Sequence, residues 1–135
     1  MLQTIAVASQ IVPAGSNVLF TSNKIKTRTC GCFGNITHEE GSGLVDLNGA
    51  GLYRVDFSAN VTTATTGNVV LALEVNGEPL GDSTIINYEV ADISQELAIA
   101  TIVRVPQGTR TLSVGNYGTA DITVSNASLI VTKEA

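Results

Sequence analysis

The stretch Gly51-Leu-Tyr-Arg-Val-Asp-Phe-Ser-Ala-Asn-Val61 decides the fold, because apolar residues occupy every second position from Tyr53 to Val61. Side chains at alternate positions of a β-strand point to opposite faces. The apolar residues would therefore share one face, and the polar residues between them would point away from it. The pattern predicts a strand with one face buried in a core.

Segments of the same kind follow one another along the chain, and none carries a helical period. Turn residues such as Asn76-Gly77 separate them. We predict ten strands, at residues 3–8, 17–21, 26–33, 43–47, 51–62, 68–76, 83–91, 95–105, 109–116 and 120–132. So many short strands predict an all-β fold, a two-sheet jelly-roll β-sandwich of about ten antiparallel strands.

Length and composition indicate one compact domain. The chain has 135 residues, of which 44% are apolar and 14% charged, which is enough to bury a single core. We predict one jelly-roll domain over residues 1–135. Residues 1–16 would form an N-terminal strand and turn, which are candidates for a subunit interface.

The charge of the chain argues against nucleic acid as a partner. The formal net charge is -5, and the seven Lys and Arg residues are scattered. Phosphate binding needs a basic stripe, so we predict no nucleic-acid binding. The carboxylates are dispersed without the spacing of a calcium loop, and we interpret them as surface residues that keep the protein soluble.

The N-terminal segment predicts neither a leader nor a membrane anchor. Its apolar run over residues 1–9 has no basic residue before it and is too short to span a membrane. We expect synthesis in the cytoplasm without a signal peptide, and no membrane insertion. We interpret as chance matches the three glycosylation sequons, Asn35-Ile-Thr37, Asn60-Val-Thr62 and Asn126-Ala-Ser128.

Two predicted strands, 68–76 and 95–105, are apolar on both faces. A sandwich normally leaves its outer faces to water, so an apolar outer face favours burial against another subunit. The alternative is that a neighbouring loop of the same chain covers it. The candidate trimer-interface residues are Val70, Ala72, Ala98, Ala100 and Ile102.

Several motifs resemble a known superfamily. Gly51-Leu-Tyr-Arg-Val-Asp-Phe57 is similar to the Gly-x-Tyr-x-Val-x-Phe strand of the jelly rolls shared by tumour necrosis factor (TNF) and the globular head of complement's first component. The hairpin Leu73-Glu-Val-Asn-Gly77 and the segment 108–116 also resemble that family. The final segment, Ala127-Ser-Leu-Ile-Val-Thr132, is similar to the terminal strand of its bacterial and phage members.

This resemblance covers residues 17–135 and implies a TNF-like jelly roll that forms a homotrimer. The aromatic content of 4% is low for the vertebrate members, so their receptor-binding roles are not carried over. Some relatives bind calcium at a trimer apex, but no residue of this sequence can be assigned to such a site.

His38 lies beside Glu39 and Glu40. Three copies near a trimer axis could bind a divalent metal; the alternative is a solvated loop. A hydrolytic triad also needs a placed nucleophile, and no nucleophile-elbow pattern is present. We therefore predict no metal site, no cofactor and no enzymatic activity.

Cys30-Gly31-Cys32 is the one unusual local motif, and three interpretations stay open. A disulfide would close a very small ring and need a distorted strand. Metal binding would need two further ligands, from other subunits or from His38. The third interpretation is a pair of buried, reduced cysteines that act as small hydrophobes.

The sequence thus predicts a non-enzymatic, homotrimeric structural or adhesive module on a larger assembly, a phage virion or a bacterial surface structure. It would act by multivalent binding to a cell-surface saccharide or protein receptor, besides contacting other proteins of the assembly. The turns 35–43 and 81–87 are the candidate contact regions. The candidate ligand-binding residues are Asn35, His38, Glu39, Glu40 and Tyr117. The alternative is a standalone carbohydrate-binding, lectin-like module, and an enzyme is the third possibility.

Overall fold

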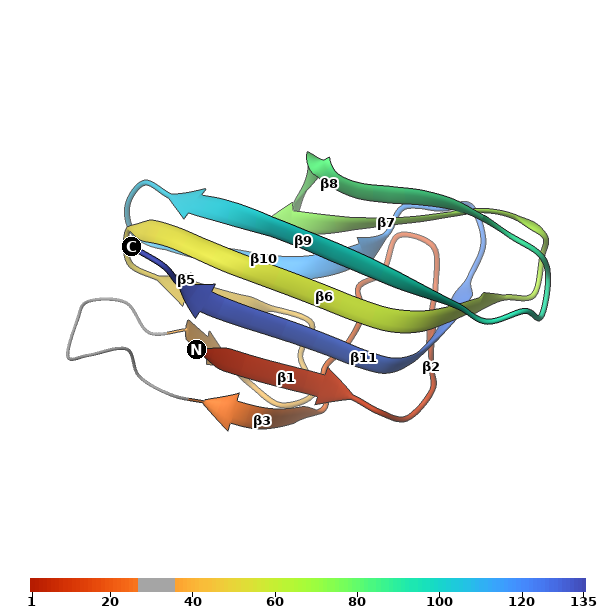
Figure 1. Cartoon of the computed structure of the whole chain (residues 1–135), viewed down its shortest axis with the longest axis horizontal. Helices are drawn as coiled ribbons and strands as arrows, with labels where there is room; N and C mark the ends of the chain where they lie inside the picture. The colour runs from red at the N-terminus through yellow and green to blue at the C-terminus, as the bar shows by residue number, and fades with distance from the viewer. Residues whose placement is uncertain (27–35) are drawn as a thin grey trace.

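The computed structural model describes residues 1–26 and 36–135. The regular secondary structure of these residues consists of β-strands alone (Figure 1). In chain order, the strands are β1 (Leu2–Ala6), β2 (Gln10–Val12), β3 (Ser22–Lys26), β4 (Ile36–His38), β5 (Val45–Asn48), β6 (Gly51–Thr63), β7 (Gly67–Val75), β8 (Glu78–Glu89), β9 (Gln95–Val105), β10 (Thr109–Asn116) and β11 (Ile122–Lys133). No helix that could span a membrane is found in this part of the chain.

The strands form two packed antiparallel sheets. One sheet has the order β3-β1-β11-β6-β9, with β2 also paired to β11, and the other has the order β4-β5-β10-β7-β8. Neighbours such as β1 and β11, or β5 and β10, are far apart in the sequence, so long connections cross between the sheets. This arrangement confirms the predicted two-sheet jelly roll.

The core lies between the sheets and follows the alternation read from β6. Tyr53, Val55 and Phe57 are buried, while the polar residues between them face outward. The ring of Phe20 meets that of Phe57 edge to face, with 6.3 Å between centroids. The Tyr53 hydroxyl donates a hydrogen bond to Gly49 O at 2.7 Å, so a buried phenol keeps a polar partner.

The long strands match their predicted bounds, since β6, β9 and β10 correspond to the predicted segments 51–62, 95–105 and 109–116. The Asn76-Gly77 hairpin is also present. Both residues have positive φ, 53° and 79°, as a two-residue hairpin turn requires. Because this turn is so short, β8 begins at Glu78, five residues before the predicted start.

Among the short strands, β1 and β5 match the predicted segments 3–8 and 43–47, but the prediction is wrong for others. Segment 17–21 contributes only an isolated bridge between Asn17 and Gly115. The strands β2 and β4 were not predicted, and each has three residues, too few for an alternation to stand out. Most of the predicted strand 26–33 lies outside the described residues.

Two edge strands lie on the same side of the sandwich. β8 ends the order of one sheet and β9 ends that of the other, and the two run next to each other (Figure 1). The edges of both sheets are therefore exposed along one side of the molecule.

Candidate interaction surface

The side formed by β8 and β9 is an unusual edge for a soluble sandwich. The two strands have 12 and 11 residues, and each pairs with only one neighbouring strand among the described residues. Long exposed edges carry unpaired backbone donors and acceptors and invite pairing with another chain, so soluble proteins usually keep them short or charged.

Exposed apolar side chains accompany these edges. Ile86 is 67% exposed, Tyr88 63% and Ile102 60%. Ala98 and Ala100 lie on the same outward row of β9 as Ile102 and are also exposed. We define the β8–β9 surface by these side chains together with two from the connection that follows β8: Ile86, Tyr88, Val90, Ile93, Ala98, Ala100 and Ile102.

Ala72 needs a correction as an interface residue. It is only 1% exposed within the single chain, and Val70 is half-buried. The reason is Tyr117, whose backbone amide donates to Val70 O at 2.8 Å and whose ring packs against Gly115, the β10 partner of Ala72. This part of the outer face is closed within the chain.

Tyr117 is held over that face by a buried carboxylate. Its hydroxyl donates to Glu74 Oε2, while Ser113 Oγ donates to Glu74 Oε1 at 2.9 Å. The hydrogen bond to Glu74, followed by burial and the carboxylate charge, raises the pKa of Tyr117 to about 12. The hydroxyl of Tyr117 is therefore occupied by Glu74, although 42% of the residue stays exposed.

His38 does not lie in a solvated loop; that expectation is wrong. It ends β4 and is buried, with Nδ1 2.6 Å from Asn23 Oδ1 and Nε2 2.8 Å from Ser42 O. Thr4 Oγ1 lies 3.3 Å from the same Nδ1. Since Thr4 and Asn23 belong to β1 and β3, His38 links the two sheets, and its ring nitrogens are occupied by internal partners.

Among the described residues, the other candidate ligand residues are not brought together into one pocket. Glu39 and Glu40 follow β4 and are exposed. Asn35, Cys30 and Cys32 lie outside the described residues. The predicted contact turn 81–87 is part of β8, so it is a strand and not a loop.

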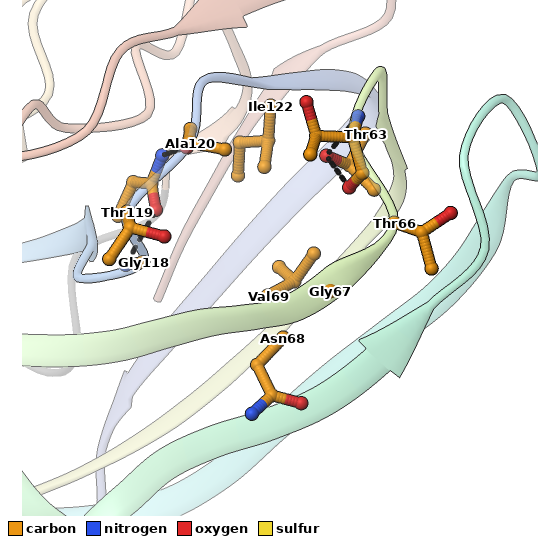
Figure 2. Close-up of a pocket in the computed structure, with 11 residues that line it drawn as sticks. Thr63, Thr66, Gly67, Asn68, Val69, Gly118, Thr119, Ala120 and Ile122 are labelled. Atoms are coloured by element: carbon orange, nitrogen blue, oxygen red, sulfur yellow. Dashed lines mark hydrogen bonds between the residues drawn. The ribbon is translucent and has the colours of Figure 1, made fainter.

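A small pocket lies at one end of the sandwich, where the β6–β7 and β10–β11 connections meet (Figure 2). Its volume is about 50 Å³, and it is lined by threonines and backbone, with Val69 and Ile122 facing it from β7 and β11. Ligand pockets usually have about 300 Å³ or more. This pocket has room for a water molecule or two but not for a sugar ring.

A second, open pocket lies on the outer face of the sheet that contains β6 and β11. A β-bulge between Ser125 and Ser128 of β11 shifts the register against β6. The pocket holds about 160 Å³, and its lining is Ser58, Ala59, Asn60, Glu96 and Asn126. Across residues 1–26 and 36–135, no three His, Cys, Asp or Glu side chains come together in a way that could hold a metal ion.

No protein-family model and no curated protein sequence matches the chain. Solved structures do match its fold. The Eiger TNF of S. frugiperda superimposes with a TM-score of 0.72 at 14% identity, over 99% of this chain and 91% of that one. Murine APRIL gives 0.70 at 16% identity, over 98% of both chains, and the globular domain of zebrafish complement 1qA gives 0.65 at 10%, over 96% and 94%.

These likenesses, at 16% identity or less, concern the fold. The chain is a jelly-roll sandwich of two antiparallel sheets. Within that class it has the TNF-like fold that TNF and complement globular domains share, as the resemblance of its β6 motif predicted.

Proposed function

We propose that this protein is a non-enzymatic binding module that works as a homotrimer. The observation that carries the proposal is the β8–β9 surface, where exposed apolar side chains accompany two long strand edges that pair with no other described strand. The homotrimer implied by the sequence resemblance supports it independently, because that resemblance rests on β6 and not on the exposed surface.

A second copy of this chain is the occupant that suits the surface best. Its side chains are apolar or small, and the charged residues on the outward row of β9, Glu96 and Arg104, flank Ala98, Ala100 and Ile102 at either end. An apolar centre with a polar rim is the usual composition of a permanent interface. In the proposed trimer this surface contacts a different face of the neighbouring copy, because only such a head-to-tail contact can close into a ring of three.

We place the trimer on a larger assembly, a phage virion or a bacterial surface structure, where it would bind a saccharide or protein receptor. The likeness of segment 127–132 to bacterial and phage members of the superfamily supports this setting. Three equivalent weak sites on one rigid scaffold would gain avidity without any single strong contact. The exposed Glu39 and Glu40, at a chain connection, are candidates for such a contact.

The solution mass tests the trimer. A chain of 14.0 kDa should elute as a species of roughly 42 kDa in light scattering coupled to gel filtration. Ile102→Glu should convert this species to a monomer, because it puts a charge on the largest exposed apolar side chain of the outward row of β9. Leu44→Glu is the matched control, since Leu44 is an exposed apolar residue before β5, away from the β8 edge of the same sheet. A wild-type monomer at micromolar concentration would overturn the proposal.

A standalone carbohydrate-binding module is the second candidate, and the open polar pocket beside the β11 bulge favours it. Ser58, Asn60, Glu96 and Asn126 offer both donors and acceptors there, as sugar hydroxyls require. Binding on a saccharide array that is lost in Glu96→Ala would support this function. If Glu96→Ala leaves the binding on the array intact, this pocket is not the saccharide site.

A further inference from the structure

The last residue of β8 carries a buried carboxylate. Glu89 is 0% exposed, and neither Oε1 nor Oε2 makes a hydrogen bond with any residue that the structure describes. Burying an ionised carboxylate without a partner is strongly unfavourable, so such a group is kept as the neutral acid. The function proposed above makes no use of it.

Glu89 lies next to a connection that is fastened by two hydrogen bonds. Its β7 neighbour in the sheet is Gly67, so the 63–66 turn that leads into β7 runs beside it. The chain after Glu89 is tied to this turn, since Ala91 N donates to Thr66 Oγ1 at 2.9 Å and Asp92 N donates to Thr63 O at 2.8 Å. The 90–94 connection and the 63–66 turn thus close the sandwich at the position of Glu89.

Among the residues that the structure describes, no positive charge near Glu89 offsets its burial. The charged residues on the neighbouring elements at this end are Asp92 and Glu96, both acidic and both exposed. Arg54 of β6 and Arg104 of β9 lie at the opposite end of these strands from Glu89, where they pair with Ile102 and Leu52 in the sheet. The Asn87 amide on β8 donates to Gln95 Oε1 at 2.7 Å. Burial raises the pKa of Glu89, and the nearby polar side chain of Asn87, which makes no hydrogen bond to either carboxylate oxygen, lowers it by less.

We propose that Glu89 is a proton-operated latch: as a neutral acid it stays buried where the 90–94 connection is tied to the 63–66 turn, and its ionisation releases that connection from the turn. The released connection would let water reach the carboxylate, which removes the cost of burying its charge. Opening confined to one connection of this kind is a common form of local unfolding.

The latch would also control part of the β8–β9 surface, a consequence that rests on the proposed function. Val90 and Ile93 lie on the released connection, and Ile93 N donates to Val90 O at 3.2 Å in the closed form. Opening would therefore displace two of the apolar side chains of the surface. The latch itself does not depend on a trimer, and amide exchange tests it apart from the solution mass.

Hydrogen exchange of the Ala91 and Asp92 amides, followed by NMR from pH 5 to pH 8 and corrected for intrinsic rates, tests the latch. The folded pKa lies above the ordinary value of 4.5, so closed protein holds a proton that open protein loses, and closure weakens as the pH rises. Protection should fall about tenfold per pH unit above 4.5 and level off beyond the folded pKa. Glu89→Gln should give a pH-independent protection.

Glu78→Gln is the matched control, because it removes the same charge from an exposed position at the other end of β8, and it should follow the wild-type profile. A flat wild-type profile, or a Glu89→Gln profile that still falls with pH, would overturn the latch. If Glu89→Gln does not fold, the carbon-13 carboxyl shift of Glu89 in the wild type decides. A midpoint at or below pH 4.5 overturns the proposal, and one clearly above it supports the latch.

Discussion

The hydroxyl of Tyr117 donates a hydrogen bond to the carboxylate of Glu74, which lies 43 residues earlier in the chain. The contact joins the residue after β10 to β7 on the outer face of their sheet. Together with Ser113, it gives both oxygens of a buried carboxylate a donor. Tyr117 thereby covers the face that includes Ala72, which leaves Ala72 out of the proposed β8–β9 surface.

Replacing Tyr117 by Phe should destabilise the fold by about 1–2 kcal/mol, because a buried Glu74 oxygen loses its donor. Urea unfolding followed by circular dichroism measures the change. Thr119→Ala, an exposed position two residues further on, should leave the midpoint in place. An unchanged midpoint in Tyr117→Phe would show that the hydrogen bond adds nothing to the stability.

The same contact predicts a late ionisation. The pKa of Tyr117 is raised to about 12, so its contribution to stability is complete below pH 10 and is lost as the pH rises towards 12. Phenolate absorbance at alkaline pH should show a component with a midpoint near 12 that Tyr117→Phe removes. Burial also raises the pKa of Tyr53, so the assignment depends on this variant. If the component that Tyr117→Phe removes has its midpoint near pH 10, the hydrogen bond from Tyr117 to Glu74 is contradicted.

Gly115 has no room for a side chain, and this predicts a strong effect of one methyl group. A Cβ there would lie 2.9 Å from Glu74 Cδ and from Tyr117 Cε2. Gly115→Ala should therefore displace Tyr117 and cost about 1–3 kcal/mol in the free energy of unfolding. Gly81→Ala is the matched control, because nothing lies within 4 Å of its Cβ position. Equal stability of the two variants would show that Tyr117 can move aside without a loss in the free energy of unfolding.

The sequence predicted those parts of the fold that depend on local alternation. The strands β6, β9 and β10 are long, and each buries alternate side chains, so their period is visible without knowledge of their neighbours. The three-residue strands β2 and β4 exist because β11 and β5 pair with them, and pairing between distant segments leaves no local period. The outward row of β9 was also predictable, since Ala98, Ala100 and Ile102 alternate with core residues.

The sequence did not predict which polar residues are buried. His38 and Glu89 read as surface residues, because polarity alone favours exposure. Their burial follows from tertiary packing: His38 meets Asn23 of another strand, and Glu89 lies next to a connection tied to residues 63–66. Ala72 was misread for the same reason, since nothing in β7 indicates that Tyr117 will fold over its neighbour.

His38 offers the last prediction, because it holds the two sheets together at their shared edge. Asn23 Nδ2 donates to His38 O at 2.8 Å, and Asn23 Oδ1 faces the ring, so the two residues form a reciprocal pair. His38→Ala should cost about 2–4 kcal/mol, since it leaves a cavity and removes the ring partners of Asn23 and Ser42. Glu39→Ala, next in the chain but exposed, should stay within about 0.5 kcal/mol of the wild type. A double-mutant cycle with Asn23→Ala should give a coupling of about 1 kcal/mol, and strictly additive losses would show that the pair does not join the sheets.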